Sequence, residues 1–122
     1  MKLTLDTNTS QFAIKGHGPG FVVINEARHN SALIVMPDKL ISPWQTPEFA
    51  ALTPSDFDLV RELRPELVIF GSGPQFRFPD PRIMVSFSQS RIGFDVMDTA
   101  AACRTYNVLM SEGRRVAAAL LI

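Results

Sequence analysis

Residues 93–107 read GFDVMDTAAACRTYN, and this stretch decides the fold. A short apolar strand over 92–97 leads directly into a long helix that Asp98 or Thr99 opens, because short polar side chains accept hydrogen bonds from the first free amides of a helix. The helix carries Arg104 and Asn107 in its early turns. The junction therefore holds polar groups that either bind a ligand or hold the fold together.

A second apolar strand lies upstream of this junction. Residues 67–70 form the continuous apolar run that is typical of a strand buried on both faces. A helix over 81–90 links this strand to the one at 92–97. Because such a crossover unit is normally parallel and right-handed, we expect the two strands to be parallel neighbours whose carboxyl ends share one edge of the sheet. Ligands bind at that edge in open α/β sheets.

This carboxyl edge is the candidate ligand site. Amides in a glycine-containing loop and at a helix start attract anions, and arginines nearby would add positive charge. The candidate ligand-binding residues are Gly71, Ser72, Gly73, Arg77, Asp98, Thr99, Arg104 and Asn107. The competing interpretation is structural: Asp98 caps the helix and Arg104 bonds to backbone carbonyls or to an acidic side chain. We favour it, because a lone Gly-x-Gly lacks the rest of a dinucleotide fingerprint or P-loop.

The last long helix offers no recognisable catalytic group. Its spacing places Tyr106 on the buried face and leaves Arg104, Asn107 and Ser111 on a face free for solvent, a ligand or a partner. Cys103 lies at the margin of the buried face with no base near it in sequence, so we expect an inert thiol. Two histidines and one cysteine at unrelated positions predict no metal site, and no catalytic triad is visible. We therefore expect no cofactor and favour a protein that is not an enzyme.

The N-terminal half is predicted to contain strands at 2–6, 21–25 and 31–36, the last two joined as a hairpin by residues 26–30. Residues 16–20 form a turn cluster. The stretch 37–54, with four prolines, is the longest irregular segment, and a helix capped by Thr53 or Ser55 follows it. At the other end, Gly113 ends the long helix, and 116–122 is read as a closing strand with a buried helix as the alternative.

Three aromatic side chains are candidates for binding a partner. Trp44 sits in the proline-rich stretch and is either a buried plug or an exposed anchor. Phe76 and Phe78 flank Arg77 and either pin their loop or face a partner. Aromatic residues on loops are common hot spots of protein interfaces.

Composition limits the class of protein. A chain of 122 residues that is 46% hydrophobic fits one globular domain. A formal net charge of zero argues against a nucleic-acid surface, and no apolar run approaches the ~18 residues of a membrane span. The N-terminus shows neither a signal-peptide nor a transit-peptide pattern. We expect a soluble, cytoplasmic protein.

Several of these motifs together resemble one family. They are Gly16 to Phe21, Pro43-Trp44, Gly71 to Gly73, Phe78-Pro79, Val96 to Thr99, Cys103 to Asn107 and Glu112 to Arg114. The chain resembles the bacterial and archaeal domains of unknown function related to mitochondrial complex I assembly factor 3. The resemblance implies a three-layer α/β domain around a mixed sheet, with a closing strand that often runs antiparallel. Together with the patterns above, we expect this sheet to be mostly parallel and an N-terminal β-hairpin region to precede it. The resemblance implies no reaction.

The function expected from the sequence is that of a non-enzymatic binding or assembly-type factor. The mitochondrial relatives in the family assemble the membrane-bound NADH dehydrogenase, so the resemblance implies a protein partner of unknown identity. A homodimer is a further interpretation. The alternative is a small-molecule or anion-binding domain, or an enzyme, that uses the carboxyl edge of the sheet.

Overall fold

The computed structural model describes residues 11–122, so the strand predicted at 2–6 lies outside the described residues. A small antiparallel sheet comes first in the chain, in the order β1-β2-β3. Its strands are β1 (Ile14–Gly18), β2 (Phe21–Ile24) and β3 (Ala27–His29). β2 pairs with β1 on one side and with β3 on the other.

A five-stranded mixed sheet forms the centre of the molecule, in the order β5-β4-β8-β6-β7. Its strands are β4 (Leu33–Met36), β5 (Lys39–Ile41), β6 (Leu67–Ser72), β7 (Gly93–Met97) and β8 (Val116–Leu121). β6 is parallel to β7 and to β8, whereas β4 is antiparallel to β8 and to β5. Since half of the pairings are antiparallel, the expectation of a mostly parallel sheet is not confirmed.

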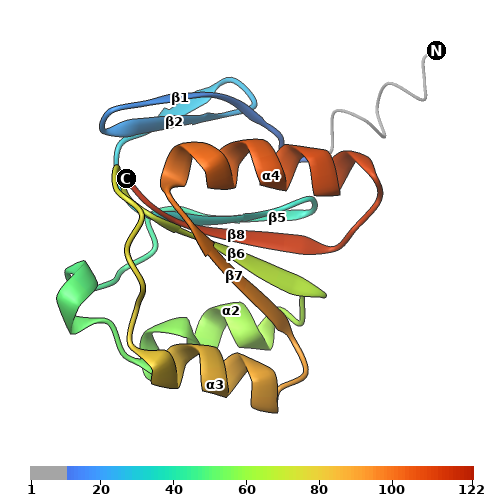
Figure 1. Ribbon diagram of the computed structural model, residues 1–122. Coiled ribbons are helices and arrows are strands. Elements are labelled where there is room, and N and C mark those ends of the chain that lie inside the picture. The colour runs from blue at the N-terminus through green and yellow to red at the C-terminus, as the bar shows by residue number, and fades with distance from the viewer. Residues whose placement is uncertain (1–10) are drawn as a thin grey trace.

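The helices cover both faces of the large sheet (Figure 1). α4 (Thr99–Ser111) lies between the small and large sheets, while α2 (Asp58–Glu62) and α3 (Pro81–Gln89) lie on the opposite face. Two 3-10 turns, Phe49–Ala51 and Pro54–Phe57, precede α2. The small sheet thus adds a layer to the three that the resemblance implies. None of the helices within residues 11–122 is long and apolar enough to cross a bilayer.

The unit β6-α3-β7 confirms the main prediction from the sequence. The two strands are adjacent and parallel, with Leu67 opposite Gly93, and α3 crosses between them. Asp80 caps α3 by accepting a hydrogen bond from the amide of Arg82 at 2.9 Å. The apolar run of β6 is buried on both faces, which is why its sequence does not alternate.

β8 is a strand, so the buried-helix alternative is wrong. It does not close the sheet at an edge but lies at its centre, parallel to β6 and antiparallel to β4. Its alanines, Ala117 to Ala119, are fully buried. Small side chains suit a central strand that must accept packing on both faces.

The hairpin predicted over 21–36 is wrong. β2 turns back at Asn25 and Glu26 to pair with β3, and Asn25 adopts the positive φ of 52° that two-residue hairpin turns require. β4 joins the other sheet, where it pairs with β5 and β8. The turn cluster at 16–20 is likewise shorter than expected, because β1 extends to Gly18. β5 forms inside the stretch that was expected to be irregular.

Each face of the large sheet has its own core. On the side of α2 and α3, Phe57 makes edge-on contacts with Trp44, Phe70 and Phe87, with ring centroids 5.2–5.8 Å apart. On the other side, Tyr106 and Cys103 of α4 pack between the two sheets. The N-terminal small sheet is therefore held to the domain through α4.

Candidate functional site

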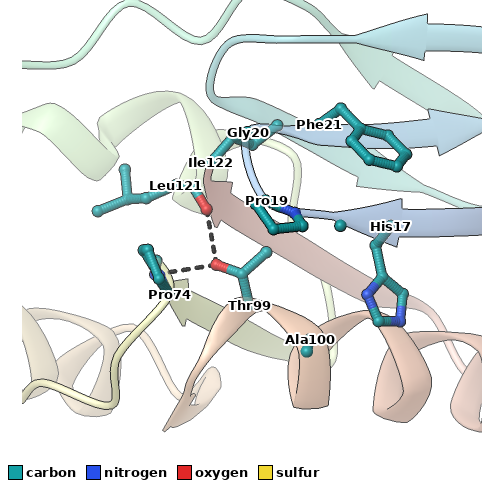
Figure 2. Close-up of a pocket in the computed structure, with 11 residues that line it drawn as sticks. His17, Pro19, Gly20, Phe21, Pro74, Thr99, Ala100, Leu121 and Ile122 are labelled. Atoms are coloured by element: carbon teal, nitrogen blue, oxygen red, sulfur yellow. Dashed lines mark hydrogen bonds between the residues drawn. The ribbon is translucent and has the colours of Figure 1, made fainter.

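Thr99 joins three segments at the carboxyl edge. Its hydroxyl accepts a hydrogen bond from the Gly73 amide at 2.9 Å and donates one to the Leu121 carbonyl at 2.6 Å (Figure 2). The Thr99 amide in turn donates to the Gly73 carbonyl at 2.9 Å. The loop after β6, the start of α4 and the end of β8 are thus fastened together. We call this set of contacts among Gly73, Thr99 and Leu121 the threonine junction.

Packing and backbone conformation explain why glycine occurs at positions 71 and 73 of the carboxyl edge. A Cβ at Gly71 would lie 2.9 Å from the Thr99 hydroxyl oxygen and 3.2 Å from its Cα, so only glycine allows α4 to start so close to β6. Gly73 has a φ of +100°, a conformation that L side chains rarely adopt. The Gly-x-Gly pattern therefore reflects packing and turn geometry.

Asp98 caps α4, as predicted, because its carboxylate accepts a hydrogen bond from the Ala101 amide at 2.9 Å.

Ser72 and Arg77 hold the loop that follows β6. The Ser72 hydroxyl donates to the Gln75 carbonyl at 2.7 Å and accepts from the Arg77 amide at 3.1 Å. The Arg77 guanidinium donates to the Ser72 carbonyl at 2.7 Å and lies 4.1 Å above the Phe49 ring. These contacts occupy most of the polar groups that an anion would use.

Arg104 and Asn107 do not join this cluster. Arg104 is exposed on α4, and its side chain makes no hydrogen bond to another residue within 11–122. The structural role favoured for Arg104, a bond to a backbone carbonyl or to an acidic side chain, is not found within residues 11–122, and Arg77 binds a backbone carbonyl instead. The ligand-binding role of the eight residues stays a prediction.

Asn107 faces the small sheet, so the prediction that it lies on a free face is wrong. Its side-chain oxygen accepts from the Ile14 amide at 3.0 Å, and its side-chain nitrogen donates to the Ile14 carbonyl at 2.7 Å. The neighbouring Tyr106 hydroxyl donates to the Phe12 carbonyl at 2.6 Å. We call these contacts the asparagine clamp. The helical wheel missed it because nothing in the sequence of α4 shows that a second sheet covers that side.

An apolar cavity of about 260 Å³ opens at the same edge (Figure 2). Its walls come from the β1–β2 turn, the loop after β6, the start of α4 and the end of β8. Only Gly73 and Thr99 of the predicted ligand set line it. The sequence could not indicate this cavity, because five of its eleven lining residues come from the small sheet, whose pairing is not predictable from local patterns.

Cys103 lies in the core between α4 and the large sheet. Cys103 is 1% exposed, and burial raises the pKa of its thiol to about 11 despite the nearby Arg104 charge. A neutral, enclosed thiol is a poor nucleophile at pH 7, which agrees with the expected inertness. In the described part of the chain, no three His, Cys, Asp or Glu side chains gather in a way that could hold a metal ion.

Trp44 is a buried plug and not an exposed anchor. It is 4% exposed, packs against Phe57, and its indole N–H donates to the Asp56 carbonyl at 3.2 Å. Of the two alternatives for Trp44, the buried plug is the one that the structure shows, because the side chain belongs to the core on the side of α2 and α3.

Phe76 and Phe78 face solvent. Their exposed fractions are 53% and 70%, and their rings contact each other edge-on with centroids 4.8 Å apart. We call residues 76–78 the aromatic loop. Arg77 between them is bound to Ser72 and Phe49, so the loop is anchored through its middle residue while its two rings remain outside.

Comparison with known proteins supplies relatives for this fold. A family model described as "Protein of unknown function (DUF498/DUF598)" matches residues 14–121. An uncharacterized protein of Rhodobacter capsulatus is 34% identical, over 88% of this chain and 82% of its own length. The NADH dehydrogenase (ubiquinone) 1 alpha subcomplex assembly factor 3 of Xenopus tropicalis is 31% identical over 98% of this chain. The chain spans 66% of that relative's length and 55% of the bovine one's.

Two solved bacterial structures share the architecture at similar identity. A crystal structure from Bordetella parapertussis superposes with a TM-score of 0.85 at 32% identity, covering 92% of this chain and 96% of that one. An NMR structure from Xanthomonas campestris gives a TM-score of 0.83 at 36% identity, covering 91% and 84%. The resemblance inferred from the sequence is confirmed.

Proposed function

We propose that this chain, which belongs to the DUF498/DUF598 family of proteins of unknown function, is a non-enzymatic assembly-type protein that binds a protein partner through the aromatic loop. The observation that carries the proposal is the exposure of Phe76 and Phe78, since the other seven phenylalanines, Trp44 and Tyr106 are buried or half-buried. Fully burying a phenylalanine side chain contributes about 1.5–3 kcal/mol, and the fold leaves much of that gain unused here.

The anchoring of the loop supports the same proposal. Arg77 is held at its amide by the Ser72 hydroxyl and at its guanidinium by the Ser72 carbonyl. A loop fixed in this way loses little conformational entropy when a partner covers its rings, and such preorganisation strengthens binding. The two rings also contact each other, so they present one continuous apolar surface.

The kind of partner is suggested by the relatives. Members of the same family carry the name of an assembly factor for NADH dehydrogenase. We propose that the partner of this chain is likewise a protein on the route to an assembled NADH dehydrogenase. A second copy of the chain is the other candidate, and the oligomeric state in solution distinguishes the two.

A complementation experiment tests the proposed function. The gene is deleted in the organism that encodes it, and assembled NADH dehydrogenase is quantified on native gels of the membranes. Wild type should restore the assembled enzyme, whereas the double variant Phe76→Ser/Phe78→Ser should not. Val108→Ser, which removes a 55% exposed apolar side chain on α4, is the matched control and should restore it. Full restoration by the double variant, or no defect in the deletion strain, would contradict the proposal.

A further inference from the structure

We propose that the cavity at the carboxyl edge binds a small uncharged apolar molecule, of a size between benzene and indole. The cavity measures about 260 Å³. An apolar cavity of roughly 150 Å³ in another protein is known to stay dry and to accept benzene, so this one has room for a larger ring system. It lies below the roughly 300–1,000 Å³ of sites for drug-sized ligands.

The walls favour an uncharged, apolar ligand. Apolar groups from Pro19, Phe21 and Leu121 line much of the space, and none of the described residues around it is Asp, Glu, Lys or Arg. The Thr99 hydroxyl reaches the cavity, but its hydrogen bonds to Gly73 and Leu121 already occupy it. A charged group would lose part of its hydration there, and the exposed His17 would offer it only a solvent-screened ion pair, whereas an apolar ring gives up no hydrogen bonds to water.

His17 is the one ionisable side chain among the described residues that line the cavity. It is exposed, so it keeps its contact with water beside the opening. The apolar interior of the cavity thus determines which class of ligand binds, and His17 at the opening contributes little to that selectivity.

A bound molecule would connect the two sheets. The β1–β2 turn supplies one wall, from His17 to Phe21, and the opposite wall comes from the large sheet and the first turn of α4. Figure 2 shows Pro19 and Phe21 on one side and Thr99 and Ala100 on the other. Occupancy should therefore slow amide exchange at Gly20 and Phe21, which a nonspecific surface contact would leave unchanged.

Indole titrated into the ¹⁵N-labelled protein tests the site, with indole-3-carboxylate as the charged analogue. Wild type should show saturable shifts at Gly20 and Gly73 with a Kd on the order of 1 mM or tighter, and the carboxylate should bind at least tenfold more weakly. Ala100→Leu fills the cavity from the helix and should weaken indole binding at least tenfold. Ala101→Leu makes the same change one residue along, outside the lining residues, and should alter it less than twofold.

The wild-type titration decides by itself if a variant fails to fold. Absence of saturable shifts in wild type overturns the proposal, and so does tighter binding of the carboxylate. Equal losses of binding in Ala100→Leu and Ala101→Leu, with both variants folded, would place indole elsewhere and also overturn it.

Discussion

The threonine junction and the aromatic loop share the segment that follows β6, where Gly73 comes three residues before Phe76, and they differ in how they use their side chains. At the junction, the Thr99 hydroxyl, the Gly73 amide and the Leu121 carbonyl are all satisfied by one another. In the aromatic loop, Phe76 and Phe78 remain 53% and 70% exposed. Glycine, threonine and aspartate, which are common in ligand sites, thus stabilise the fold here. Phenylalanine, which is usually a core residue, is exposed to solvent in the aromatic loop.

The two regions are connected through one pair of residues. Ser72 ends β6 beside the junction, and its hydroxyl and carbonyl accept the hydrogen bonds that anchor Arg77, while the same hydroxyl donates to the Gln75 carbonyl. The junction therefore acts as a fixed base for the loop. We therefore expect variants of the junction and of the asparagine clamp to lower the free energy of unfolding, and variants of the aromatic loop to leave it unchanged.

Among the variants that compare the two regions, the largest expected effect is at the asparagine clamp. Asn107→Ala removes both partners of the Ile14 backbone and should lower the free energy of unfolding by about 2–4 kcal/mol, because a partly buried amide and carbonyl lose their hydrogen bonds. Chemical denaturation measures the change. Ser111→Ala, at an exposed site on the same helix, should cost under about 0.5 kcal/mol. Similar losses in the two variants would mean that α4 holds the small sheet by other contacts.

Cys103 provides a pH test of the buried face of the same helix. Its thiol has a pKa of about 11 in the folded state, above its ordinary value of 9.0, because burial disfavours the thiolate. The unfolded chain therefore releases the proton first, so stability is complete below pH 9 and is lost as pH rises toward 11. The loss at pH 11 should reach about 2–3 kcal/mol relative to pH 8. Cys103→Ala should lack this component, and parallel pH profiles for the two proteins would refute the buried thiol.

Thr99→Val tests the junction itself. The substitution keeps the shape of the side chain and removes the hydroxyl that serves Gly73 and Leu121, so it should cost about 1–3 kcal/mol. Thr99→Ser keeps the hydroxyl and should recover most of the stability. Denaturant midpoints that coincide for valine and wild type would show that these hydrogen bonds add nothing to the fold.

The cap of α4 should matter somewhat less. Asp98→Ala leaves the Ala101 amide without its acceptor and should cost about 0.5–2 kcal/mol. Asp98→Asn retains a side-chain oxygen at the cap and should fall between alanine and wild type. A melting temperature unchanged by Asp98→Ala would argue that water replaces the carboxylate at this position without loss.

The sequence predicts the parts of this fold that local patterns encode. The crossover unit β6-α3-β7 is predictable because an apolar run, a helix pattern and another strand follow in order. The cap at Asp98 is predictable because it depends on residues three positions apart. The small sheet is not predictable in this way. Whether β2 pairs with β1 or with β4 depends on how β2 packs against α4, which local sequence does not show.

The candidate site shows the same limit. The clamp between Asn107 and Ile14 joins residues 93 positions apart, and no local pattern announces it. Trp44 and Phe76 both occur near prolines in irregular segments, yet one is buried under Phe57 and the other faces solvent. Only the three-dimensional arrangement separates a core aromatic from an exposed one in such segments.

The stability of Phe76→Ser/Phe78→Ser tests the central claim most directly, namely that the two exposed phenylalanines of the aromatic loop do not contribute to the stability of the fold. Urea denaturation of the purified protein gives its free energy of unfolding, with Phe57→Ala as the core control. The account predicts a change below about 1 kcal/mol for the double variant, because both rings are exposed, and about 3–5 kcal/mol for the control. A loss above about 2 kcal/mol in the double variant would contradict the account, since the phenylalanines would then belong to the core.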